Sequence, residues 1–112
     1  MTTTSSMSST TTTIGRHVVH VDAEGFMTDP SEWDEELALA LAAQIGIELT
    51  AEHWVAIHFL RDDFRVHGET ATVRRISTSG GISTKDLFRL FPGKPAKKLA
   101  YVAGLPKPHG CV

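Results

Sequence analysis

Hydrophobic residues recur at helical spacing from residue 29 onward, and capping residues divide this region into separate helices. The first predicted helix spans residues 29–46, with Asp29 as its N-cap, Pro30 at its first position and Gly46 after its end. An apolar side chain at every fourth position predicts one buried stripe on this helix. The stripe consists of Trp33, Leu37, Leu41 and Ile45.

The same signals predict four further helices. Thr50 and Ser83 are suited to cap two of them, and Pro95 is suited to open the last one. Gly68 is placed to end the longest helix. The predicted ranges are residues 50–68, 71–77, 83–91 and 95–104.

A β-hairpin is predicted ahead of the helices, over residues 14–27. Residues 17–21 (His-Val-Val-His-Val) favour a strand, and residues 22–25 (Asp-Ala-Glu-Gly) favour a turn before Phe26 and Met27. A single hairpin is marginally stable in water, so we expect it to lie against the helices.

The two ends of the chain differ from the region between them. Residues 1–13 contain eleven Ser or Thr and no apolar periodicity, which predicts a disordered tail. Pro106 and Pro108 exclude a helix after residue 104, so residues 105–112 are predicted to be a flexible, extended arm. The fold class is therefore mainly α: a small bundle of about five short helices with an N-terminal β-hairpin, over residues 14–104, and an extended C-terminal arm.

Composition and charge indicate one globular domain. The 112 residues allow one core, and the single cysteine cannot form an internal disulfide. No apolar run reaches the roughly 18–20 residues of a membrane span, so we expect no membrane association and a cytoplasmic location. Residues 1–64 hold eleven acidic and two basic side chains, whereas residues 65–112 hold nine basic and two acidic ones. The two halves either neutralise each other across the fold or leave a basic surface that recruits an acidic partner, protein or RNA.

The single cysteine, Cys111, is the candidate reactive residue. It lies outside every predicted element, whereas structural cysteines are usually buried within elements. An extended segment of eight residues spans about 25 Å, enough to present the thiol to the site of another protein. A thiolate there can take sulfur from a persulfide and pass it on. From the spacing alone, an incidental thiol in the tail remains the alternative.

Four motifs point to one family. The most specific is residues 104–112 (Gly-Leu-Pro-Lys-Pro-His-Gly-Cys-Val). Residues 90–92 (Leu-Phe-Pro) with 95–97 (Pro-Ala-Lys), residues 49–54 (Leu-Thr-Ala-Glu-His-Trp) and residues 22–26 (Asp-Ala-Glu-Gly-Phe) support it. With these motifs the chain resembles the DsrC/TusE family of small sulfur-trafficking proteins, over about residues 17–112.

The resemblance implies a mostly helical fold and a sulfurtransferase that carries sulfur as a persulfide on Cys111, without a cofactor. Members that act with dissimilatory sulfite reductase have a second cysteine eleven residues earlier, where this chain has Ala100. Single-cysteine members imply a sulfur donor of the TusBCD or DsrEFH type and an acceptor such as a tRNA thiouridylase, in tRNA 2-thiouridine synthesis. A role in dissimilatory sulfur oxidation stays open as the alternative.

Basic side chains of the C-terminal half either dock a partner or form a plain solvated surface. The candidate docking residues are Arg74, Arg75, Arg89, Lys97, Lys98 and Lys107. The second and third predicted helices, with Arg74 and Arg75 on the latter, also allow a helix-turn-helix DNA reader. Asp62 and Asp63 would repel phosphate, which disfavours direct DNA binding. The six histidines are scattered, so we expect no metal site.

Overall fold

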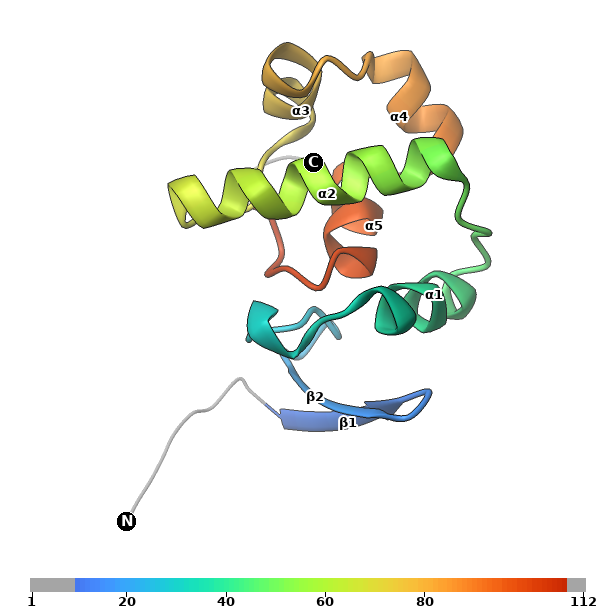
Figure 1. The fold of residues 1–112 in the computed structure, drawn as a ribbon, viewed down its shortest axis with the longest axis vertical. Coiled ribbons are helices and arrows are strands. Elements are labelled where there is room, and N and C mark those ends of the chain that lie inside the picture. The colour runs from blue at the N-terminus through green and yellow to red at the C-terminus, as the bar shows by residue number, and fades with distance from the viewer. Residues whose placement is uncertain (1–9, 109–112) are drawn as a thin grey trace.

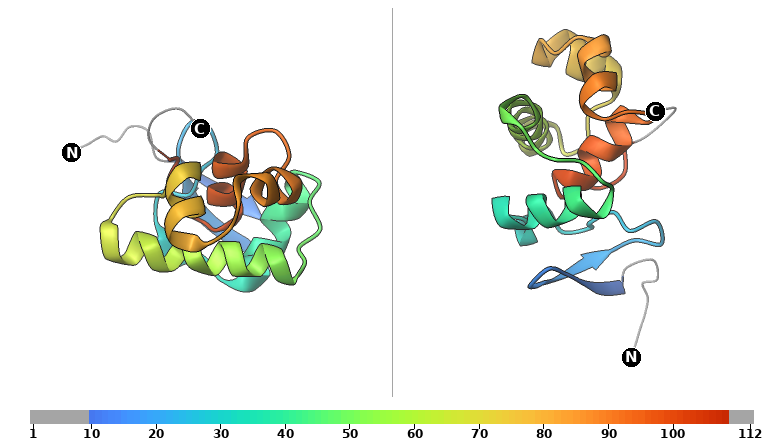
Figure 2. Two further views of the ribbon diagram at one scale, coloured as in Figure 1. Left: turned by 90° about the horizontal axis from the view of Figure 1, so that it is seen from above. Right: turned by 90° about the vertical axis from the view of Figure 1, so that its right-hand side faces the viewer.

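The computed structural model describes residues 10–108, which stack along the long axis of the molecule (Figure 1). The elements are β1 (Thr10–Ile14), β2 (His17–Val21), a 3₁₀ turn (Pro30–Glu32), α1 (Glu35–Gln44), α2 (Ala51–His67), α3 (Val73–Gly80), α4 (Thr84–Leu90) and α5 (Pro95–Val102). The hairpin and α1 lie at one end, α3 and α4 at the other, and α2 and α5 between them (Figures 1 and 2). The predicted fold class, mainly α with an N-terminal hairpin, is confirmed.

The hairpin exists, and β2 is the strand predicted over residues 17–21, but its partner strand is not the predicted one. β1 pairs antiparallel with β2, from Thr10 opposite Val21 to Ile14 opposite His17. The predicted turn at residues 22–25 does form, and it leads to a single bridge between Val21 and Met27. The prediction of a disordered tail is therefore wrong for residues 10–13, which belong to β1. Their threonines are exposed and show no apolar alternation, so only pairing with β2 identifies the strand.

The first predicted helix is divided in two. Asp29 accepts a hydrogen bond from the Ser31 N–H, as its capping role requires, but only a 3₁₀ turn follows. Trp33 has an extended backbone (φ −86°, ψ 146°), and Asp34 then caps α1 by accepting from the Leu37 N–H at 2.8 Å. The break frees the Trp33 indole to donate to the Val102 carbonyl oxygen at 2.9 Å, which no i to i+4 pattern predicts.

The remaining helices lie close to the predicted ranges. α3 is displaced the most: Thr72 accepts from the Arg75 N–H and caps the helix, which begins at Val73, two residues after the predicted start. α2 begins after Thr50, and the imidazole of His53 joins this end to α4. The His53 Nδ1 accepts from the Thr50 N–H at 3.0 Å, and Nε2 donates to the Leu90 carbonyl at 2.9 Å. This pair of bonds selects the tautomer that carries its proton on Nε2.

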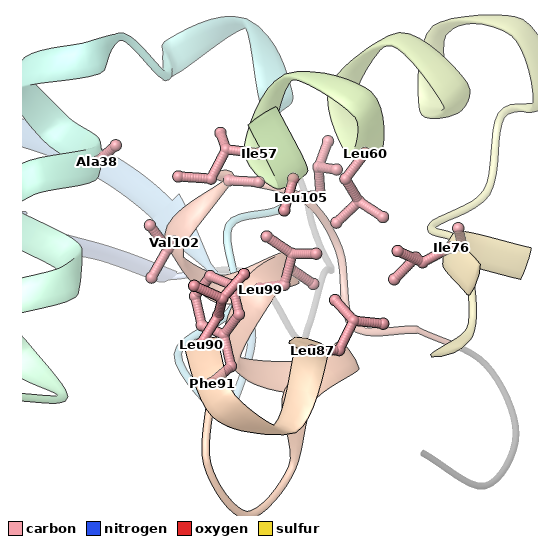
Figure 3. Packing of buried hydrophobic residues seen from close by; sticks show 14 of the residues in the cluster. Ala38, Ile57, Leu60, Ile76, Leu87, Leu90, Phe91, Leu99, Val102 and Leu105 are labelled. Atoms are coloured by element: carbon pink, nitrogen blue, oxygen red, sulfur yellow. The ribbon is translucent and has the colours of Figure 1, made fainter. Parts of the chain in front are cut away.

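The main core surrounds α5, which contacts α1, α2 and α4. Figure 3 shows Ile57 and Leu60 of α2, Leu87 and Leu99 in one cluster. A second cluster packs the hairpin against α1. Its buried members are Ile14, Val19, Val21, Met27, Leu37 and Leu41. Within residues 10–108, no helix combines the length and hydrophobicity that a bilayer crossing needs.

Candidate functional site

The segment that leads to Cys111 leaves α5 through a tight turn. Gly104 has φ +69°, and its N–H donates to the Tyr101 carbonyl at 3.3 Å. The Leu105 N–H donates to the Ala100 carbonyl at 3.0 Å. These two bonds form a Schellman motif, in which the residue after the cap is left-handed. The turn places the Leu105 side chain, 1% exposed, in the main core with Leu60 (Figure 3).

Gly104 is required by space as well as by conformation. A Cβ atom at this position would lie 2.3 Å from Cδ1 of Trp33 and 2.8 Å from its Cβ. Only a residue without a side chain fits between the turn and the indole. The glycine that follows α5 is thus also the point where the C-terminal segment touches Trp33, between the 3₁₀ turn and α1.

Arg61 of α2 holds the same turn from the other side. Its Nη1 donates to the Ala103 carbonyl at 2.8 Å and its Nη2 to the Pro30 carbonyl at 3.1 Å. Its guanidinium carbon lies 4.1 Å from the centroid of the Trp33 ring. Burial lowers the pKa of Arg61, but a guanidinium remains protonated at neutral pH and keeps all its donors. The cation therefore joins α2, the 3₁₀ turn and the end of α5.

Two further contacts hold residues 106–108 on the body of the protein. The buried Thr70 hydroxyl donates to the Pro106 carbonyl at 2.7 Å. Lys107 Nζ lies 2.7 Å from Glu24 Oε2, and this hydrogen bond holds the pKa of Glu24 below its ordinary value. Pro108 is buried. The C-terminal segment is therefore attached to the loop after β2 and to the loop after α2.

These contacts correct the prediction of a flexible arm that starts at residue 105. Residues 105–108 pack against the body of the protein, because the Schellman turn directs the chain back over the core instead of away from it. Cys111 lies outside the described residues, as does the rest of the predicted arm. Covalent geometry still limits its position: three residues beyond Pro108 place its Cα at most about 11 Å from that of Pro108.

The structure does not gather the six candidate docking residues on one face. Arg75 is bound within the fold, since its Nε lies 2.9 Å from Oδ1 of the buried Asp63. Arg89 Nη2 lies 2.8 Å from Glu52 Oε2 on the neighbouring helix. Arg74 is exposed on α3, which lies at the end of the molecule opposite the hairpin (Figure 1). The remaining candidates, Lys97, Lys98 and Lys107, lie around Glu24 and the start of α5.

Sequence reasoning missed the residues that hold the C-terminal segment in place. Trp33 was expected only in a buried stripe, and no role was predicted for Arg61 or Thr70. Their partners are 31 to 69 residues away in the chain and are mostly backbone carbonyls, which carry no sequence signal. Gly104 was the one available hint, because a glycine after a helix predicts a left-handed turn.

Comparisons with known proteins agree with this geometry. The profile of the family described as "DsrC like protein" matches residues 13–112. Sulfurtransferase TusE of Salmonella typhimurium is 36% identical over 101 aligned residues, which cover 84% of this chain and 93% of the relative. Sulfurtransferase TusE of Escherichia coli (strain K12) is 34% identical with the same coverage.

Solved structures of similar sequence have the same fold. The NMR structure of Allochromatium vinosum DsrC matches with a TM-score of 0.79 and 35% identity, covering 93% of this chain and 99% of that one. The crystal structure of the oxidized gamma-subunit of dissimilatory sulfite reductase (DsrC) from Archaeoglobus fulgidus matches with a TM-score of 0.72 and 38% identity, covering 92% and 100%. Because the family profile covers β2, the helices α1 to α5 and the C-terminal segment, the chain belongs to the DsrC-like family.

Proposed function

We propose that this protein is a sulfurtransferase of the carrier type, which accepts sulfane sulfur as a persulfide on Cys111 and passes it to a partner protein. The observation that carries the proposal is the reach of the family match, which continues to residue 112 and so includes the Cys111 segment. The relatives named Sulfurtransferase TusE support the same activity.

The transfer step conserves atoms and electrons. The Cys111 thiolate attacks the outer sulfur of a donor persulfide, the S–S bond of the donor breaks, and the donor leaves as a thiolate. The new S–S bond is on Cys111, and the proton of the outer sulfur moves with it. The Cys111 sulfur goes from thiolate to persulfide while the donor cysteine goes from persulfide to thiolate, so the exchange needs no external oxidant, reductant or cofactor.

A single thiol determines how the persulfide is discharged. Cys111 is the only cysteine of the chain, and the position of the second family cysteine is occupied by Ala100, which is 0% exposed within α5. With no second thiol, the chain cannot resolve the persulfide into an internal disulfide or trisulfide. The sulfur therefore stays on Cys111 until a thiol or an activated substrate of another protein takes it.

The packed base of the C-terminal segment restricts the range of delivery. With Cys111 within about 11 Å of Pro108, the thiol does not reach across a long distance into a partner. The partner instead comes to the body of the protein, next to Lys107 and Glu24. We infer that residues 105–108 act as a fixed base which sets the site of transfer.

The names of the relatives support a pathway for the carrier. Because the similar sequences are called TusE, we place the protein in tRNA 2-thiouridine synthesis in the cytoplasm, with a sulfur donor of the TusBCD or DsrEFH type and a tRNA thiouridylase as acceptor. The similarity to DsrC structures favours dissimilatory sulfur oxidation as the second candidate.

Intact-protein mass spectrometry tests the proposal. After incubation with a persulfide donor, the wild type should gain the mass of one sulfur atom, and a thiol reductant should remove it. Cys111→Ser should show no gain under the same conditions. A wild-type protein that stays unmodified by cysteine persulfide and by several protein donors would refute the carrier function.

A further inference from the structure

A groove beside the base of the C-terminal segment combines an apolar floor with a cationic rim. We call it the lysine groove; its volume is about 370 Å³, and it is lined by Glu24, Phe26, Ile45, Lys94, Lys97, Lys98 and Tyr101. The Phe26 and Tyr101 rings meet edge to face, with centroids 6.1 Å apart, and so form a firm floor. Such a surface accepts an apolar side chain that is flanked by negative charge.

The rim carries positive charge that the fold leaves largely uncompensated. Lys94 is the N-cap of α5, and Lys97 and Lys98 lie in its first turn, where the helix dipole is also positive and so does not stabilise them. Within the described residues, Lys94 has no acidic partner, and Lys98 donates to the Pro92 carbonyl. Among the described residues of the lining, Glu24 is the only carboxylate; Lys107 bonds it, and Lys97 is close enough to lower its pKa as well.

The lysine groove lies beside Lys107, in the base of the segment that carries Cys111. Glu24 lines the groove and holds Lys107, which precedes Cys111 by four residues. Four residues span at most about 14 Å, so the Cys111 backbone stays within that distance of the Lys107 backbone. A protein seated in the groove would therefore be bound near the base of the segment that carries Cys111.

An acidic protein segment fits the lysine groove better than RNA does. RNA binding requires phosphate contacts along a longer track, whereas the lysines of the groove form one short cluster at the start of α5. Among the two partners of the carrier, the donor is the better match. An acceptor that modifies tRNA presents a basic surface to its substrate, and a basic surface would be repelled by the lysines.

We propose that the lysine groove docks an acidic segment of the sulfur-donor protein, with an apolar side chain on the Phe26–Tyr101 floor and carboxylates at Lys94 and Lys97. This inference rests on the proposed function. The docked segment orients the donor persulfide toward Cys111 and raises the rate of loading, while Cys111 carries out the chemistry.

Sulfur loading measured from two sources tests the proposal. One source is a reconstituted TusBCD-type complex, and the other is free cysteine persulfide, which needs no docking surface. The groove variant is Lys94→Glu with Lys97→Gln. The matched control is Arg16→Glu with Lys85→Gln, which makes the same change in net charge at exposed positions that do not line the groove.

At low ionic strength, the groove variant should take up sulfur from the complex at least about tenfold more slowly than the wild type. The difference between the two loading rates should narrow as salt is added, because salt screens the charges. The control variant should load at the wild-type rate from both sources, and the groove variant should load normally from cysteine persulfide. Equal slowing of both variants, or wild-type loading of the groove variant, would overturn the docking site.

Two other results would also reject this assignment. If the groove variant loads normally from the complex but loses binding to labelled tRNA, the groove is an RNA site. If the wild type loads from neither source, the carrier function itself fails, and the docking site fails with it. Loading from cysteine persulfide thus separates a failure of the chemistry from a failure of the docking surface.

Discussion

Substitution of Gly104 by alanine should destabilise the protein through one added methyl group. Gly104 has φ +69°, a left-handed conformation that costs a residue with a side chain about 1–2 kcal/mol. The new Cβ would also lie 2.3 Å from Cδ1 of Trp33, which is well inside van der Waals contact. The side-chain and backbone shifts that relieve such a clash typically cost about 1–3 kcal/mol of stability. The free energy of unfolding should therefore fall by about 2–5 kcal/mol.

Gly46 provides the matched control for the steric part of this cost. It has φ +72°, nearly the same as Gly104, but no atom lies within 4 Å of the position that its Cβ would occupy. Gly46→Ala should therefore lose only the conformational contribution, about 1–2 kcal/mol. The difference between the two variants isolates the contact with Trp33.

Urea titration followed by tryptophan fluorescence measures both losses. In a domain of this size, each kcal/mol also lowers Tm by about 4–8 °C, so a thermal scan gives a second reading. If Gly104→Ala and Gly46→Ala lose the same stability, the close contact between Gly104 and Trp33 does not exist in solution. Trp33 would then not be what restricts residue 104, at the base of the C-terminal segment, to glycine.

Three further predictions follow from contacts around the site. Arg61→Lys should lose about 1–3 kcal/mol of stability, because an ammonium cannot both bridge two carbonyls and stack on Trp33. Its control, Arg65→Lys, changes an exposed ion pair and should lose almost no stability, so equal losses of the two variants in urea titrations would contradict the prediction. His53→Ala should cost about 2–4 kcal/mol by removing both hydrogen bonds and the ring; unchanged stability in urea would refute the bridge between α2 and α4. Since Lys107 lowers the pKa of Glu24, their ion pair is present above the ordinary carboxylate pKa and is lost as the pH falls through the lowered value. An NMR titration of Glu24 should show its pKa rising in Lys107→Gln, and an unchanged pKa would mean that the pair is absent.

Local signals predicted the helices well because capping uses residues that are close in the chain. Thr50, Ser83 and Pro95 mark the starts of α2, α4 and α5, and Gly68 follows the end of α2 with φ +73°. Each signal depends on hydrogen bonds within one turn or on the dihedral angles of one residue. The family motif at residues 104–112 was equally local, and it identified Cys111 as the candidate sulfur carrier.

The errors occurred where a distant segment determines the local conformation. Thr10–Ile14 forms a strand only because β2 supplies the partner for its hydrogen bonds. Trp33 interrupts a helical pattern because its indole binds the end of α5 and stacks on Arg61. No window of neighbouring residues contains these partners, so periodicity alone could not reveal them.

The sequence by itself determined the helical segments, the single thiol, and that position 100 holds alanine where other family members have a second cysteine. Each of these depends only on residue type and spacing. Only the tertiary structure decided that residues 105–108 pack on the body, that Arg75 is bound to Asp63, and that three lysines share a groove beside Glu24. These features depend on contacts between segments that are far apart in the chain. Such contacts form when the hydrophobic core brings α1, α2 and α5 together, and no local pattern encodes them.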